Sequence, residues 1–182
     1  CPYSGEKETY QLNQKVGVAV KETADTIICA LENGFYRLNQ NDSSVELIVN
    51  PEEDRPENIF NDGKCDKAGN FWAGSVHREE LEEKGSLYCL SADFKCEPKY
   101  NGVTISNGIA WTEDYKTMYY IDTPTLQVAA FDYDMDICTI SNKRVAVEFS
   151  PEYGMPDGMT IDTDGNLWVA MWGGSGVYKC NP

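Results

Sequence analysis

Short runs of alternating apolar and polar residues follow one another along the whole chain, and Gly, Asn, Asp and Pro separate them. A period of two is typical of β-strands that are buried on one face, and the separating residues are those that form tight turns. Helical periodicity is weak everywhere except at Arg78–Lys84, an acidic stretch that we interpret as a loop or a single turn. The pattern therefore predicts an all-β protein.

Several of these runs are copies of one another. The segments around Asn61, Asn107 and Asp157 read FNDGKCDKAGNFWAG, ISNGIAWTEDYKTMYYID and MPDGMTIDTDGNLWVA, and a weaker copy begins at Val16. The starting positions are 45, 46 and 50 residues apart. In the first and third segments an acidic residue lies five positions on and a Trp eleven positions on, namely Asp66 with Trp72 and Asp162 with Trp168. In the second segment Thr112 and Met118 take those places.

A repeat of this length filled with short strands indicates the blades of a β-propeller. Each unit reads as four strands, and in the unit that starts at Asn107 they are Gly108–Thr112, Thr117–Asp122, Gln127–Asp134 and Arg144–Phe149. The turns KAGN (67–70) and TDGN (163–166) place a Gly where a tight hairpin requires positive φ. We also expect Trp72, Trp168 and Trp172 to pack between blades; the alternative for Trp172 is that it borders a pocket near Asp157.

The units divide the chain into a strand at Glu8–Leu12, three complete blades and three strands of a further blade that ends at Cys180. Two arrangements fit this division. The chain closes into a four-bladed ring, with Glu8–Leu12 completing the last sheet, or it is an internal portion of a larger ring. We expect a single β-propeller domain over residues 1–182 that is incomplete at both ends.

Equivalent positions in successive blades lie at the same height around the central axis of a propeller. Asn61, Asn107 and Asp157 are therefore expected to converge at one end of the channel. Side chains that carry oxygen suit a hard cation such as Ca²⁺ or Mg²⁺. The alternative is that each residue forms a turn before Gly, although Val16 in the fourth copy shows that the register does not demand such a residue.

Composition narrows the possible functions. The hydrophobic fraction of 41% indicates a globular chain, and no apolar run is long enough to span a membrane. The net charge of −15 and the lack of a basic stripe exclude nucleic acid as an expected partner. The sequence does not define the oligomeric state.

The seven cysteines are an odd number, and no two of them form a C-x-x-C pair. Several lie within predicted strands, where a buried thiol is an ordinary packing residue. We interpret them as free thiols in a reducing compartment, expect a cytoplasmic protein, and expect no zinc site built on cysteine.

The repeated segments, together with VAAFDYD and ISNKRVAVEF, resemble the senescence-marker/gluconolactonase/luciferin-regenerating (regucalcin-like) family. The resemblance runs from about Gly17 to Pro182 and follows the family's order of motifs. It implies a six-bladed propeller and a hydrolase of sugar lactones. It also implies one divalent cation, which is Ca, Zn, Mg or Mn, at the mouth of the channel.

By this resemblance Asn107 and Asp157 are metal ligands, and Asn61 contacts the substrate or metal-bound water. The family's third ligand is a Glu in an E-G-P context, which is expected before Cys1. Ile59 stands where some members carry an Arg that contacts the substrate. The sequence thus departs from the family's pattern at one substrate contact.

The resemblance also assigns roles to carboxylates. Asp157 is a candidate catalytic base as well as a ligand. Glu79 or Glu80 is a candidate for binding sugar hydroxyls, and of the two we choose Glu79. The alternative for both glutamates is a solvated acidic turn. The expected partner is a small sugar lactone, with no membrane. A different class of function stays open, which is a calcium-binding or interaction propeller without catalysis, because a propeller fold alone does not determine function.

Overall fold

The computed structural model describes residues 5 and 7–182. The strands form separate antiparallel sheets in chain order. The first sheet contains β1 (Val16–Lys21), β2 (Thr26–Leu31), β3 (Gly34–Asn39) and β4 (Val45–Val49). The second contains β5 (Asn58–Cys65), β6 (Phe71–His77), β7 (Gly85–Leu90) and β8 (Cys96–Val103). The third contains β9 (Ser106–Trp111), β10 (Thr117–Asp122), β11 (Gln127–Asp134) and β12 (Thr139–Glu148). The fourth contains β13 (Met155–Ile161), β14 (Leu167–Trp172) and β15 (Gly176–Cys180), and two 3-10 turns lie at Thr123–Thr125 and Pro151–Tyr153.

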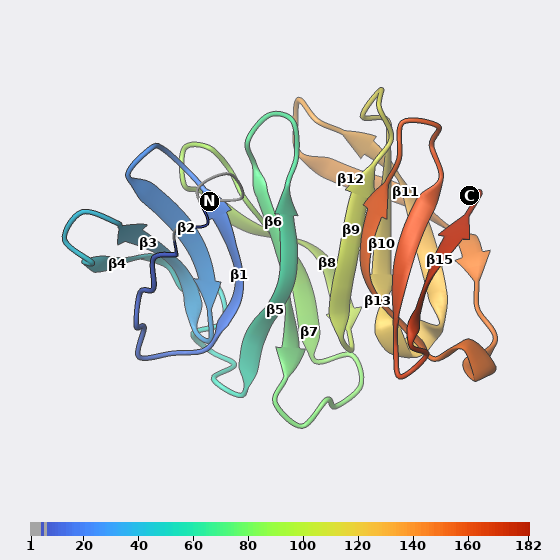
Figure 1. Cartoon of the computed structure of the whole chain (residues 1–182), viewed down its shortest axis with the longest axis horizontal. Helices are drawn as coiled ribbons and strands as arrows, with labels where there is room; N and C mark the ends of the chain where they lie inside the picture. The colour runs from blue at the N-terminus through green and yellow to red at the C-terminus, as the bar shows by residue number, and fades with distance from the viewer. Residues whose placement is uncertain (1–4, 6) are drawn as a thin grey trace.

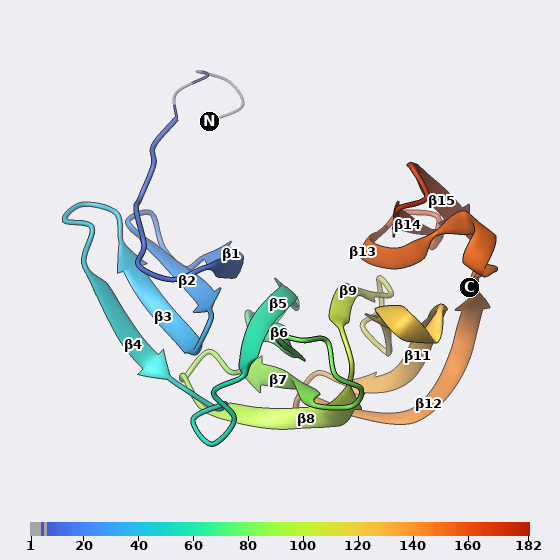
Figure 2. The same ribbon diagram turned by 90° about the horizontal axis from the view of Figure 1, so that it is seen from below.

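The sheets are arranged as consecutive blades around a common axis (Figure 1). Seen along this axis they form an open arc, with β1, β5, β9 and β13 along its concave side and β4, β8 and β12 along its convex side (Figure 2). The division of the chain into three four-stranded blades and three strands of a fourth is confirmed. Closure into a four-bladed ring is wrong, because the first and fourth sheets stand on opposite sides of the opening in the arc.

The strand predicted at Glu8–Leu12 is also wrong, since this segment forms no strand. Tyr10 and Leu12 instead pack against a small cluster on the first sheet that contains Cys29, Leu31 and Leu38. The apolar side chains of this segment thus pack on the first sheet, although its backbone does not pair with a neighbouring strand. Apolar alternation predicts which side chains are buried, but not whether the backbone pairs with a neighbouring strand.

The core lies between neighbouring sheets. Within the third sheet, Ile109 and Trp111 pack toward the second sheet, whereas Ala110 between them packs toward the fourth. A similar layer between the first and second sheets contains Phe35 and Phe60, whose ring centroids lie 4.7 Å apart. A blade with a neighbour on each side therefore buries both faces of its sheet. Successive residues along its strands are apolar because they pack on opposite neighbours.

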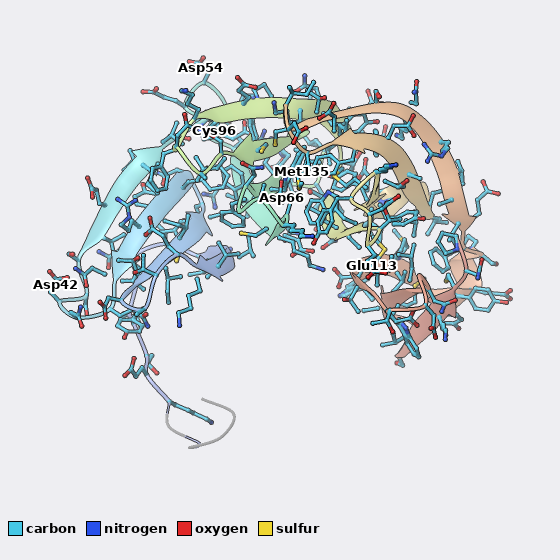
Figure 3. The ribbon with its side chains drawn as sticks, turned by 90° about the horizontal axis from the view of Figure 1, so that it is seen from above. Asp42, Asp54, Asp66, Cys96, Glu113 and Met135 are labelled. Carbon is cyan, nitrogen blue, oxygen red and sulfur yellow. The ribbon has the colours of Figure 1, made fainter. Side chains whose placement is uncertain are left out.

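The acidic residue and the Trp of the repeat are hydrogen-bonded to each other. The indole Nε1 of Trp72 donates to Asp66 at 3.2 Å, and that of Trp168 donates to Asp162 at 2.9 Å. Asp66 and Asp162 also accept the backbone N–H of the Asn that ends each hairpin turn, and the Gly of both turns has positive φ as predicted. Asp66 lies inside the arc, whereas Asp42 and Asp54 lie at its outer edge (Figure 3).

The three Trp residues differ in burial. Trp72 is 0% exposed and packs edge-on against Trp111 and Tyr133 of the next blade, so the predicted packing between blades is confirmed there. Trp168 is 39% exposed and Trp172 is 71% exposed, so for these two the packing between blades stays a prediction. Their sheet is the last along the arc, and no further described blade covers its outer face. No helix in the described part of the chain is long and apolar enough to cross a membrane.

Candidate functional site

Each innermost strand carries a β-bulge at the start of its repeat. The register of β5 against β6 shifts between Phe60 and Gly63. The register of β9 against β10 shifts at Asn107, and that of β13 against β14 shifts between Pro156 and Met159. A similar shift between Val16 and Val18 interrupts β1. A bulge leaves extra residues on one strand and changes the direction of their side chains. The repeated polar residue therefore sits in every copy where the regular strand alternation is broken.

The inner strands approach each other closely at this point. A Cβ atom added to Gly108 would lie 2.8 Å from the Asp157 carbonyl oxygen and 2.6 Å from the Cβ of Met159. Only Gly fits there, because real Cβ atoms are not found at such distances. The Gly after Asn107 thus allows β9 and β13 to lie side by side, and this brings Asn107 next to Asp157.

A chain of hydrogen bonds links the inner strands of three blades. Asn61 Nδ2 donates to the Ser106 carbonyl at 2.8 Å and to Asn107 Oδ1 at 3.3 Å. Asn107 Nδ2 donates to Thr123 Oγ1 at 2.8 Å, and Thr123 Oγ1 donates to the Pro156 carbonyl at 2.8 Å. The amide nitrogen of Asn107 is therefore occupied, which fixes its oxygen on the side of Asn61. None of these bonds uses the Asp157 carboxylate.

Asn107 and Asp157 line one pocket of about 210 Å³. Asn107 is only 7% exposed, and Asp157 is half-buried. Trp172, 71% exposed, lines the same pocket, as the sequence suggested. The remaining lining side chains include Ile105, Thr123 and Met155. The pocket thus combines two carboxylate side chains, those of Asp157 and Glu80, with one amide, apolar walls and one indole ring that is open to solvent.

The two candidate glutamates separate in the structure. Both side chains are exposed, but only Glu80 lines the pocket, and its backbone adopts a positive φ of 53°. The N–H of Glu79 donates to His77 Nδ1 at 3.1 Å. Asn61 reaches the pocket region through its hydrogen bond to Asn107. The substrate-binding role of Glu79 stays a prediction, and Glu80 is the residue whose position accords with such a role.

Asp62 is a channel carboxylate that the sequence analysis did not select. Burial raises the pKa of the Asp62 carboxyl and the negative charge of Asp157 adds to this, while the Gly63 N–H and Lys64 oppose it. Lys64 Nζ donates to the Met159 carbonyl at 2.9 Å, so it spans from the second blade to the fourth. Burial in turn lowers the pKa of Lys64, and the charge of Asp62 acts against this.

Strict alternation would direct Asn61 and Asp62 to opposite sides of β5. The bulge between Phe60 and Gly63 removes that restriction. The only available signal in the sequence was the acidic residue directly after Asn61 in FNDG.

The donor atoms at this site fit a hard divalent cation. Asn107 and Asp157 line one pocket and carry amide and carboxylate oxygens, which are the ligand types that Ca²⁺, Mg²⁺ and Mn²⁺ favour. Two such ligands do not complete a coordination shell of six to eight oxygens. No cluster of three or more His, Cys, Asp or Glu suited to a metal occurs among the described residues.

Comparison with known proteins agrees with this architecture. The family model for the SMP-30/Gluconolactonase/LRE-like region matches residues 1–182. Regucalcin of Xenopus laevis is 36% identical over 186 residues, covering 100% of this chain and 62% of that protein. The "Putative sugar lactone lactonase YvrE" of Bacillus subtilis is 38% identical over 167 residues, covering 92% of this chain and 57% of that protein.

Solved structures give the same result. A luciferin-regenerating enzyme superposes with a TM-score of 0.88 at 35% identity, over 93% of this chain and 59% of that one. A calcium-binding protein, regucalcin, from Agrobacterium tumefaciens superposes with a TM-score of 0.91 at 25% identity, over 97% of this chain and 60% of that one. The chain thus spans about three fifths of the length of these relatives. It belongs to the SMP-30/gluconolactonase/LRE-like family.

Proposed function

We propose that the protein hydrolyses sugar lactones with the help of one divalent cation bound at the inner ends of the blades. The observation that carries this proposal is the placement of Asn107 and Asp157 on one pocket, at equivalent bulges of neighbouring inner strands. Membership of the gluconolactonase family supports the reaction class. The printed name of the Bacillus subtilis relative supports the substrate class.

Asn107 and Asp157 would hold the cation, and the bound cation would polarise the lactone carbonyl and stabilise the negative charge that develops on its oxygen. Asn107 suits this role because its amide nitrogen donates to Thr123, while its oxygen accepts one hydrogen bond from Asn61 at 3.3 Å and has a second lone pair for a cation. Asp157 is also placed to accept a proton from the attacking water, since no described side chain donates to its carboxylate in the hydrogen-bond chain of the site.

The substrate would lie between the polar inner strands and the exposed indole of Trp172. An aromatic ring supplies a flat apolar surface for the C–H face of a sugar ring, and Asn61 and Glu80 supply polar atoms at its edges. The described residues enclose about 210 Å³ of this pocket.

The test measures initial rates of gluconolactone hydrolysis by the full-length protein during titration with Ca²⁺, Mg²⁺, Mn²⁺ or Zn²⁺. Asp157→Ala removes a charged ligand and the candidate base, so we expect activity to fall by at least ~10²-fold, which corresponds to about 3 kcal/mol of lost transition-state stabilisation. Asn107→Ala removes a neutral ligand, so we expect weaker metal binding and partial recovery at excess metal.

Asp164→Ala is the matched control, because it removes the same charge from the exposed hairpin turn of the same blade. It should behave as wild type. Full activity of Asp157→Ala, or activity that a chelator does not change, would refute the metal-dependent hydrolase.

A non-catalytic calcium-binding function is the second candidate, and the structural relative from Agrobacterium tumefaciens, described as a calcium-binding protein, favours it. In that case Ca²⁺ would bind with dependence on Asp157, but lactone would not turn over with any of the metals. Calorimetric titration of the same variants with Ca²⁺ separates the two functions.

A further inference from the structure

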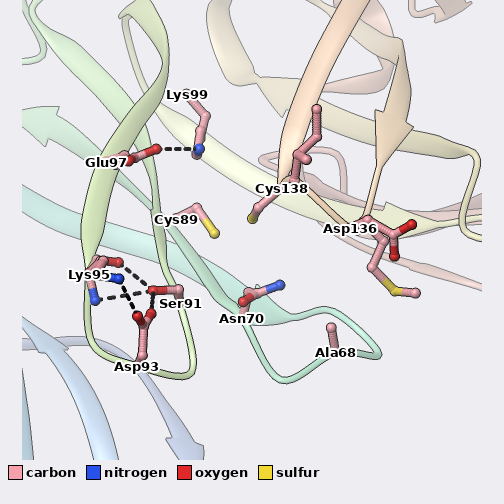
Figure 4. Close-up of a pocket in the computed structure, with 12 residues that line it drawn as sticks. Ala68, Asn70, Cys89, Ser91, Asp93, Lys95, Glu97, Lys99, Asp136 and Cys138 are labelled. Carbon is pink, nitrogen blue, oxygen red and sulfur yellow. Dashed lines mark hydrogen bonds and ion pairs between the residues drawn. The ribbon is translucent and has the colours of Figure 1, made fainter.

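Two cysteines from neighbouring blades, Cys89 and Cys138, line one cavity of about 470 Å³ that shares no lining residue with the candidate site. Cys89 lies on β7 of the second sheet and is buried. Cys138 lies in the turn between β11 and β12 of the third sheet and is half-buried. The two sulfur atoms point toward one another (Figure 4). The described cysteines form no disulfide, and Cys1 lies outside the described residues.

The surroundings of the pair shift the pKa values of the two thiols in opposite directions. The Cys89 thiol beside it lowers the pKa of Cys138, with further contributions from Lys99 and Tyr133, while burial and Asp66 act in the opposite direction. Cys138 and burial raise the pKa of Cys89. Cys138 is therefore the more acidic thiol of the pair and Cys89 the less acidic one. A thiolate is the reactive form of cysteine.

The other described cysteines differ from Cys138 in this respect. Burial raises the pKa of Cys29, Cys65 and Cys180, and it raises the pKa of Cys96 to about 12. Among the described cysteines, only Cys138 therefore combines a lowered pKa with a second thiol directed at it. The cavity rim carries the exposed residues Asp93 and Lys95, so a small polar oxidant has a path to the sulfur atoms.

The backbone around Cys138 allows the sulfur atoms to close. Cys138 is the last residue of the turn at 135–138 and has a φ of 50°, so it lies at the end of a hairpin and not within a packed ladder. A disulfide requires Cβ atoms about 3.5–4.5 Å apart, and a hairpin turn adjusts by such an amount more easily than a central strand. Cys89 on β7 provides the fixed partner.

We propose that Cys89 and Cys138 form an oxidisable dithiol site that takes a small peroxide as its co-reactant and links the second and third blades by a disulfide. The Cys138 thiolate attacks one oxygen of hydrogen peroxide, the O–O bond breaks, and the departing hydroxide takes up a proton to become water. The Cys89 sulfur then loses its proton and attacks the sulfur of the Cys138 sulfenic acid. The S–O bond breaks and a second water leaves, so two thiols and one hydrogen peroxide give one disulfide and two waters.

The test uses the purified full-length protein, reduced and then treated with equimolar hydrogen peroxide, alkylated and digested with trypsin. Cleavage after Lys84 and Lys95 yields peptide 85–95, whose only cysteine is Cys89, and cleavage after Lys116 and Lys143 yields peptide 117–143, whose only cysteine is Cys138. We expect a species in which these two peptides are joined and which dithiothreitol separates. In the chain-entropy model the cross-link should raise the melting temperature by roughly 6–15 °C.

Three variants refine the test. Cys138→Ser should give no cross-linked peptide, Cys89→Ser should accumulate a sulfenic acid that dimedone traps at Cys138, and Cys96→Ser, the matched control, should cross-link as wild type. Competitive alkylation of the reduced wild type gives a readout that does not depend on the folding of any variant, and Cys138 should react faster than Cys96 at pH 7.5. Oxidation of Cys138 to sulfinic acid without the cross-link, or alkylation of Cys138 no faster than of Cys96, would overturn the proposal. None of these readouts involves lactone hydrolysis.

Discussion

Replacement of Gly108 by Ala tests whether close contact between the inner strands holds the candidate site together. The added Cβ would lie 2.6 Å from the Met159 Cβ, and 2.8 Å from both the Met159 nitrogen and the Asp157 carbonyl oxygen. Two of these three atoms belong to the backbone, so a change of side-chain rotamer does not relieve the contact. A normal van der Waals distance requires β9 and β13 to separate by roughly 1 Å.

The energetic cost follows from this geometry. Overpacking of a closely packed interior costs about 1–3 kcal/mol. For a protein of this size about 2 kcal/mol corresponds to a decrease in the melting temperature of roughly 4–8 °C. The separation also moves Asn107 away from Asp157, and a misplacement of about 1 Å in an active site costs on the order of 10²-fold in rate. Gly108→Ala should therefore lose more activity than its stability loss alone explains.

Gly176→Ala is the matched control, since Gly176 is also a strand residue, the first of β15, and its added Cβ would meet only Tyr178 Cε2 at 3.5 Å and the Gly174 carbonyl oxygen at 3.8 Å, both ordinary contacts. Its unfolding free energy should stay within about 0.5 kcal/mol of wild type. Both variants are compared by guanidinium unfolding and by lactone hydrolysis at a temperature where each is folded. If Gly108→Ala unfolds at the wild-type denaturant concentration and retains wild-type activity, the inner strands do not depend on this contact and the reasoning fails.

Two further predictions use matched pairs of variants. Asp66→Ala leaves the buried donors of Trp72 and Tyr133 without an acceptor and should cost about 2–4 kcal/mol in unfolding free energy. Asp164→Ala, in an exposed hairpin turn, should stay within about 0.5 kcal/mol of wild type, and equal losses for the two variants in urea denaturation would contradict this. Glu80→Gln should raise KM for the lactone several-fold and Glu79→Gln should not, because only Glu80 lines the pocket; steady-state kinetics that show the reverse would support the assignment of Glu79 from the sequence.

Much of the architecture was predictable because it depends on local chemistry repeated along the chain. The period of two predicted the strands, and β10 and β11 have the bounds expected from it. The Gly residues of KAGN and TDGN occupy positive φ in the hairpins, since the turn geometry requires it. The common register of Asn61, Asn107 and Asp157 likewise predicted their convergence, and Asn61 and Asn107 are hydrogen-bonded while Asn107 and Asp157 share a pocket.

Tertiary structure decided the direction of side chains at the bulges and the contacts between blades, because neither follows from the period of two along the chain. The bulge of β5 brings Asp62 into the channel beside Asp157, although alternation alone would turn it away from Asn61. The burial of Trp72 likewise depends on the third blade, because Trp111 and Tyr133 of that blade pack edge-on against its ring. The facing of Cys89 and Cys138 has the same origin, since residues far apart in the sequence become neighbours only when two blades pack together.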